Sequence, residues 1–126
     1  MNNLRHRDEC APFETKDTSL IREILHPDSS SVRHQSLAEA TLPSGARTQA
    51  HFHPQSEEIY FVLRGEGILR IEGTQSILKP GHAVAIAPGV RHQMENRGRG
   101  ELVFLCCCAP PYSHADTILC DSLFED

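Results

Sequence analysis

Two histidines stand one residue apart, at positions 51 and 53, and two adjacent glutamates, Glu57 and Glu58, follow them. On a β-strand, residues i and i+2 point to the same face, with their Cα atoms about 6.6 Å apart. His51 and His53 can therefore direct both imidazoles at one point about 2 Å from each ring nitrogen, the distance that a first-row metal requires. Two polar positions on a solvated strand face would give the same pattern, so this pair alone establishes no metal site.

Two further candidate ligands lie downstream in the sequence. Glu58 opens an apolar segment, and His92 follows shortly after the turn sequence APGV. Three imidazoles and one carboxylate form a mixed nitrogen and oxygen set that suits Fe(II), Mn, Ni, Cu or Zn. The sequence thus predicts one divalent transition metal held by four side chains, provided that the fold brings them together.

The elements that must position these residues are short strands. Gly- and Pro-containing turn signals recur at short, fairly even intervals, a cadence that favours an all-β sandwich or barrel. Between them lie segments of strand length, namely SLAEATL (36–42), EIYFVL (58–63), ILRIE (68–72), AVAIA (83–87) and ELVFLCCCA (101–109). The segment TSLIREIL (18–25) is ambiguous, because Thr18 is a suitable cap for a short helix.

Length and composition bound the protein class. The chain has 126 residues, of which 39% are apolar and 23% charged, and it lacks tryptophan. This size gives one domain with one largely aliphatic core. The formal net charge is −5, and between residues 64 and 101 arginines alternate with glutamates, so no stripe of one sign exists to neutralise phosphates. Nucleic acid is therefore not an expected partner.

Neither a secretory signal nor a membrane span is evident in the sequence, so we expect a cytoplasmic protein with no membrane partner. The five cysteines are an odd number and three of them are consecutive, at 106–108. In the cytoplasm they are expected to be reduced thiols.

At this point the spacing resembles the two motifs of the cupin family. The first is matched by a glycine, the H-x-H pair, a glutamate and a second glycine with every interval in place, at Gly45, His51, His53, Glu58 and Gly65. The second is matched by Gly81, Gly89, His92 and Asn96, with Ala87 where the motif has its first proline. The resemblance covers roughly residues 36–110.

This resemblance implies a double-stranded β-helix, a small jelly-roll barrel, with the metal inside. It implies that His51, His53, Glu58 and His92 are the ligands and that the protein is a homodimer. The whole chain, 1–126, is then a single cupin domain. The motif-bearing barrel covers about 36–110 and has flanking N- and C-terminal segments. The first dozen residues and the last few are expected to be loose.

The alternation of a strand decides which glutamate faces the metal. Glu57 and Glu58 point to opposite faces, and the motif count back from Gly65 selects Glu58. Tyr60 and Val62 share its parity and should line the pocket as substrate-binding residues. Ile59, Phe61 and Leu63 would pack on the other side, and Glu57 would be a solvated charge.

The same alternation assigns the three consecutive cysteines to opposite faces of a strand. Cys106 and Cys108 share one face of the last long strand and Cys107 takes the other. A C-x-C pair can bind metal or act as a redox pair, but free cysteine in an apolar segment more often packs as a small hydrophobe, which we prefer. If the even-numbered pair faces inward, it borders the metal pocket. His114 and Asp116 in YSHADT are interpreted as part of a turn.

The leading functional hypothesis is a mononuclear metalloenzyme of small-molecule metabolism, such as an Fe(II)-type dioxygenase. Glu58 would be a ligand and, if it detaches, a proton acceptor in catalysis. One alternative is a non-catalytic cupin that binds a sugar or small acid. Another is a metal-dependent sugar isomerase in which Arg47 clamps an anionic group.

Overall fold

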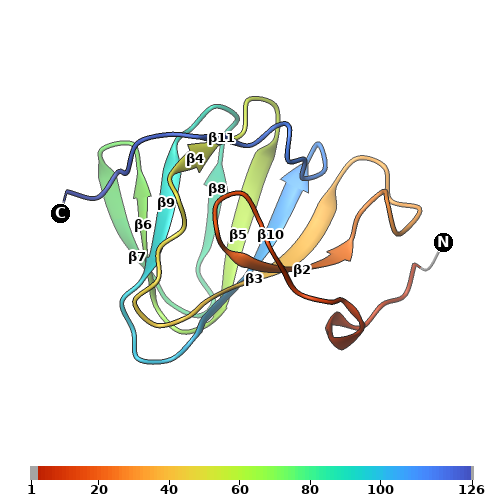
Figure 1. The fold of residues 1–126 in the computed structure, drawn as a ribbon, viewed down its shortest axis with the longest axis horizontal. Coiled ribbons are helices and arrows are strands. Elements are labelled where there is room, and N and C mark those ends of the chain that lie inside the picture. Colours follow the sequence, from red (N-terminus) through yellow and green to blue (C-terminus); the bar gives the residue numbers. More distant parts are fainter. Residues whose placement is uncertain (1–2, 126) are drawn as a thin grey trace.

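The computed structural model describes residues 3–125, which form two antiparallel β-sheets packed face to face (Figure 1). The only helical element among these residues is a single 3-10 turn, η1 (Arg7–Glu9). The strands are β1 (Phe13–Glu14), β2 (Leu20–Leu25), β3 (Ser36–Leu42), β4 (His51–Phe52), β5 (Glu57–Arg64), β6 (Gly67–Ile71), β7 (Thr74–Leu78), β8 (Ala83–Ile86), β9 (His92–Asn96), β10 (Leu102–Ala109) and β11 (Ile118–Leu119).

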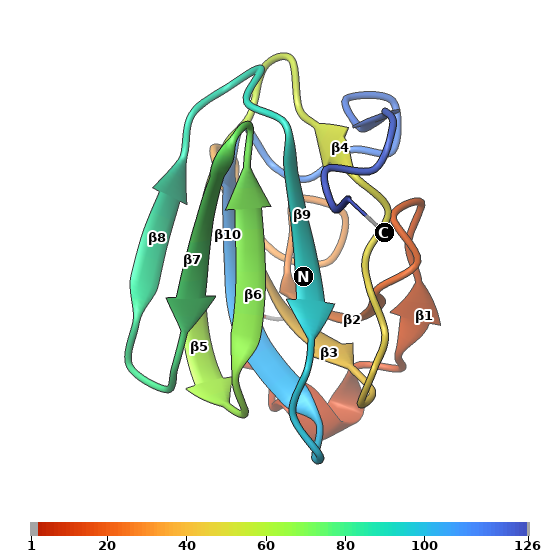
Figure 2. The same ribbon diagram turned by 90° about the vertical axis from the view of Figure 1, so that its left-hand side faces the viewer.

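One sheet has six strands in the order β1-β2-β3-β10-β5-β8, and the other has five in the order β11-β4-β9-β6-β7. In Figure 2, β6, β7 and β9 lie in front of β5, β10 and β3, with the core between the two layers. Strands that are neighbours in a sheet are often distant in the chain, as β3 and β10 are. This double-stranded β-helix confirms the predicted fold class.

The core forms because each inner strand presents apolar residues at every second position. β5 alternates between exposed and buried from Glu57 to Leu63, so Glu58, Tyr60 and Val62 point inward. The buried cluster is largely aliphatic, as predicted, and its members include Leu42, Val62, Leu69, Met94, Leu102 and Phe104. The odd positions Ile59, Phe61 and Leu63 face outward and are 40–44% exposed.

The segments on either side of residues 36–110 add strands to both sheets. Residues 18–25 hold strand β2 and no helix, because Ile21 packs into the core while β2 pairs with β3. β1 and β2 extend the six-stranded sheet, and β11 extends the other. Arg7 forms an ion pair with Glu39 at 2.8 Å. The strands β1, β2 and β11 lie outside the first dozen residues and the last few, so the looseness of those ends stays a prediction.

No helix within residues 3–125 is long and apolar enough to cross a membrane.

Gly65 makes the tight connection between β5 and β6, and a side chain there is doubly disfavoured. Its φ is +83°, and a Cβ atom would lie 2.5 Å from the backbone oxygen of Glu101. Gly81 has a similar φ of +92° but has open space where a Cβ would stand. A comparison of substitutions at these two glycines therefore separates the effect of backbone strain from that of a steric clash with the backbone.

We expect Gly65→Ala to lower the free energy of unfolding by about 2–4 kcal/mol, because strain and collision add. Gly81→Ala, the matched control, should cost about 1 kcal/mol, from its backbone conformation alone. Urea unfolding of the metal-free proteins measures both. Equal losses in the two variants would mean that the close approach of residues 65 and 101 does not constrain this turn.

Candidate metal centre

Four polar side chains meet in the space between the two sheets. His51 is the first residue of β4, His53 follows that strand, and His92 is the first residue of β9. β4 and β9 are paired, with His51 directly opposite His92. Glu58 comes from β5 in the facing sheet. All four are at least 95% buried, so each strand brings its side chain to a common, enclosed centre.

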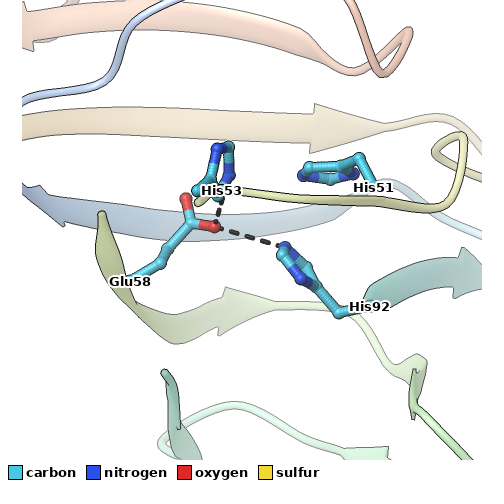
Figure 3. A group of neighbouring side chains, drawn as sticks. All are labelled: His51, His53, Glu58 and His92. Atoms are coloured by element: carbon cyan, nitrogen blue, oxygen red, sulfur yellow. Dashed lines mark ion pairs between the residues drawn. The ribbon is translucent and has the colours of Figure 1, made fainter. Parts of the chain in front are cut away.

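The ligand atoms of these residues converge. The four atoms that a metal would use all lie within 4.8 Å of one another. Oε1 of Glu58 lies 3.3 Å from Nε2 of His53 and 3.4 Å from Nε2 of His92 (Figure 3). The ring centroids of His51 and His92 are 4.3 Å apart. The structure thus brings together the whole set that the sequence predicted.

Each imidazole is held in one orientation by its outer nitrogen. Nδ1 of His51 lies 2.9 Å from the backbone oxygen of Gln49, and Nδ1 of His92 lies 2.9 Å from that of Val90. Nδ1 of His53 lies 3.1 Å from the backbone oxygen of Asp116. A carbonyl oxygen can only accept, so every Nδ1 carries the proton and donates it. In its neutral form each ring therefore turns an unprotonated Nε2 toward the centre, which is the arrangement found around protein-bound metals.

The atoms at the centre lack partners of their own. Among the described residues, Oε1 of Glu58 and Nε2 of His92 are buried without a hydrogen bond. Buried polar atoms are costly unless paired, and two acceptors that face each other at this distance require a cation or a proton between them. Three nitrogens and one carboxylate oxygen suit a divalent transition metal. The residues present therefore fit such an ion.

Electrostatics at the centre keep Glu58 ionised. Burial raises the pKa of Glu58, but hydrogen bonding and charge from His53 and His92 outweigh burial and leave the pKa well below its usual range. Burial lowers the pKa of His51, and the neighbouring His92 lowers it further. Burial also lowers the pKa of His53, but the interaction with Glu58 more than offsets it and raises the pKa overall. His53 thus holds a positive charge more readily than His51 does.

A small cavity of about 40 Å³ adjoins the centre. His51, His53 and Glu58 line one part of it, and Tyr60, Cys106 and Cys108 line another. A space of about 10–15 Å³ holds one water, so a small ligand or a few waters fit without movement of the walls.

The thiol of Cys108 donates a hydrogen bond to Oε2 of Glu58 at 3.2 Å. This contact occupies one carboxylate oxygen and leaves Oε1 to face the imidazoles. Burial raises the pKa of Cys108 well above its ordinary value, and the charge of Glu58 raises it further. Cys106 and Cys108 are buried and line the cavity, as predicted for an inward-facing even-numbered pair, whereas Cys107 is half-buried and outside the lining.

The remaining candidate residues fall in different places. Tyr60 lines the cavity, whereas Val62 is fully buried deeper in the core and is not part of the lining. Arg47 is also outside the lining; it forms an ion pair with Glu95, and its guanidinium lies 4.4 Å from the ring centroid of Phe124. Substrate-binding roles for Val62 and Arg47 stay predictions that the cavity does not favour. Glu57 is exposed, as its parity requires.

Two aspartates to which the sequence assigned no role at the metal, Asp17 and Asp116, support the centre. The carboxylate of Asp116 accepts hydrogen bonds from the backbone nitrogens of Gln55 and Ser56, so it fixes the turn after His53. Oδ2 of Asp17 lies 3.5 Å from Nε2 of His51. Both stand outside the two motifs, and only contacts between distant segments bring them here.

The two adjacent glutamates give a matched test of the centre. Glu58→Gln should release metal about tenfold faster or more under a chelator, because it removes the anionic ligand while an amide oxygen remains. Glu57→Gln changes a solvated charge and should leave release unchanged. Chelator competition, followed with a colorimetric metal indicator, measures both variants side by side. If Glu57→Gln released metal as readily as Glu58→Gln, the strand register would be misassigned.

Comparison with known proteins agrees with this geometry. A family model described as "Cupin domain" matches residues 38–108. An uncharacterized protein, MJ1618, of Methanocaldococcus jannaschii is 46% identical over 110 residues, which are 87% of this chain and 88% of that protein. An oxalate-binding protein of Thermotoga maritima is 35% identical over 68 residues, 54% of this chain and 56% of that protein.

Among solved structures, the polyketide cyclase RemF of Streptomyces resistomycificus superimposes with a TM-score of 0.78. It is 20% identical, and the match covers 100% of this chain and 88% of that one, so the likeness concerns the fold alone. The family model spans both motifs and more than half of the chain. This protein therefore belongs to the cupin family, and its three histidines and one glutamate form a buried group that could hold a metal ion.

Proposed function

We propose that this protein binds one divalent transition metal and uses it as an enzyme on a small molecule, with oxygen-dependent oxidation of the dioxygenase type as the leading reaction. The observation that carries the proposal is the convergence of three imidazole Nε2 atoms on a buried oxygen of Glu58 that has no hydrogen bond of its own. Such an arrangement is costly in a dry interior unless a cation completes it.

The residues of the chain have distinct roles in this proposal. His51, His53, His92 and Glu58 hold the ion, which supplies Lewis-acid polarisation and, if it is iron, electrons for reaction with dioxygen. Cys108 keeps one oxygen of Glu58 in place. Tyr60 presents a neutral phenol to the cavity, because burial raises its pKa well above the ordinary value. A second role of Glu58 as a proton acceptor stays a prediction.

A non-catalytic binding protein is the second candidate, and the oxalate-binding relative in Thermotoga maritima favours it. In that case the same ion would hold a small acid without converting it. A sugar isomerase would need a cation to clamp an acidic or phosphorylated sugar, and Arg47, the residue proposed for this, is engaged with Glu95 and Phe124 outside the cavity. This third reading is therefore the least supported.

We also propose that the protein is a homodimer. The outward row Ile59, Phe61 and Leu63 on β5 gives apolar area that a second copy would cover. A cytoplasmic location stays a prediction.

The enzyme and the binding protein are separated by turnover. Fe(II)-loaded protein, prepared without oxygen, should consume oxygen in step with loss of one member of a panel of small acids, diols and hydroxyketones. His53→Ala should abolish this consumption, and His34→Ala, a change at an exposed histidine outside the centre, should not. An oxygen electrode and product analysis provide the measurement.

A different result would favour the non-catalytic binding protein. Metal-loaded protein that consumes no oxygen and converts no member of the panel, yet melts at a higher temperature in the presence of one ligand, would establish the binding reading.

A further inference from the structure

The turn between β1 and β2 places Asp17 at the metal cavity. Asp17 is 91% buried, since only 9% of its surface is exposed, and it lines the same cavity as His51 and Glu58. Its backbone oxygen accepts a hydrogen bond from the backbone nitrogen of Gln49 at 2.7 Å. The neighbouring Lys16 donates to the backbone oxygen of Thr117 at 2.9 Å. The turn is thus tied to segments that flank the centre.

The two carboxylate oxygens of Asp17 have different surroundings. Oδ1 accepts hydrogen bonds from the hydroxyls of Thr15 and Ser19, at 2.6 and 2.7 Å, and from the backbone nitrogen of Ser19 at 3.0 Å. Oδ2 instead faces the centre, 3.5 Å from Nε2 of His51. Three donors on Oδ1 fix the rotamer, so Oδ2 is a preset acceptor beside the metal position.

The rest of the cavity carries no balancing cation. Among residues 3–125, those that line the cavity include no lysine or arginine, and they do include a further acid, Glu23. The two positive charges of a divalent ion are balanced by the negative charges of the Glu58 and Asp17 carboxylates. A dianion that entered would therefore gain attraction from the ion alone and would meet repulsion from Asp17 at short range.

An uncharged ligand with a hydroxyl group meets the opposite situation. Its hydroxyl can donate to Oδ2, and a hydrogen bond to an ionised acceptor is stronger than one between neutral groups. Apolar walls from Ile21, Ala38, Ala40 and Phe104 suit a carbon backbone, and about 40 Å³ of space suits only a small one.

We infer that Asp17 is a substrate-binding residue that selects small, uncharged, hydroxyl-bearing ligands, such as hydroxyketones or diols, against dicarboxylates such as oxalate. This inference rests on the proposed metal site, because Oδ2 acts on whatever occupies the position next to that ion. It goes beyond the ligand set in assigning a role to a residue outside both motifs.

The test uses Mn(II)-loaded protein with two probes, oxalate and hydroxyacetone. Binding is read from the change in water-proton relaxation as a probe displaces water from the manganese, after metal content has been measured for every sample. Asp17→Asn removes the charge and keeps a carbonyl oxygen for the donors on Oδ1, so its NH2 group takes the place of Oδ2. Glu14→Gln, an exposed carboxylate on β1 outside the cavity, is the matched control.

For Asp17→Asn we expect the affinity for oxalate to rise about tenfold or more, because a nearby negative charge is gone. The affinity for hydroxyacetone should fall about threefold or more, because its hydroxyl loses a charged acceptor. Glu14→Gln should change neither. If Asp17→Asn does not fold, Asp17→Ser, which also removes the charge, carries the same expectation for both probes.

Three outcomes would overturn the inference. Metal-loaded Asp17→Asn with unchanged affinities, or with both affinities moving in the same direction, would refute it while leaving the metal site intact. Loss of manganese from Asp17→Asn alone would make Asp17 a ligand of the metal. Failure of the unaltered protein to bind manganese or any other divalent transition metal would refute the proposed function together with this inference.

Discussion

Three hydrogen bonds from histidine Nδ1 atoms to backbone oxygens are the constraint on which the centre depends. They fix the tautomer of His51, His53 and His92 and turn every Nε2 inward. Two of the oxygens belong to Gln49 and Val90, each two residues before the start of β4 or β9, and the third belongs to Asp116 in the C-terminal segment. The barrel therefore sets both where the rings stand and which nitrogen can bind. Because the ligands are already oriented in the buried interior, the free-energy cost of rearranging them on binding an ion is small.

Much of this could be predicted from the sequence because the ligands follow local rules. Alternation on a strand puts Glu57 and Glu58 on opposite faces, and the motif count back from Gly65 selects Glu58 for the inner one. The same alternation separates Cys106 and Cys108 from Cys107. The spacing of the two motifs then places His92 with the rest, since β4 and β9 pair at His51 and His92. Strand alternation and motif spacing do not depend on the segments that flank the two motifs.

The supporting residues could not be predicted in this way. Asp116 reaches His53 across 63 positions of the chain, and Asp17 meets His51 only because β1 and β2 join the six-stranded sheet. Neither contact leaves a periodic signal. Residues 18–25 were ambiguous for the same reason, because a strand that joins a sheet edge is decided by its partner, here β3, and not by its own propensity.

Charge in the cavity links these supports to function. Burial raises the pKa of Tyr60 and of Cys106 well above their ordinary values, so both stay neutral beside the centre. The negative charge close to the ion then comes from Glu58 and Asp17. In the proposed function Glu58 is a ligand of the ion, and in our inference Asp17 selects the substrate, so a residue outside the family motifs would give this protein a preference of its own.

X-ray absorption spectroscopy of the zinc-loaded protein tests the central claim most directly, because it identifies the ligand atoms themselves. The account predicts a first shell of nitrogen and oxygen only, at about 2.0–2.2 Å, with outer-shell scattering from three imidazoles. A sulfur scatterer at about 2.3 Å would place Cys106 or Cys108 on the metal. That result, or scattering from fewer than three imidazoles, would contradict a centre built from His51, His53, His92 and Glu58.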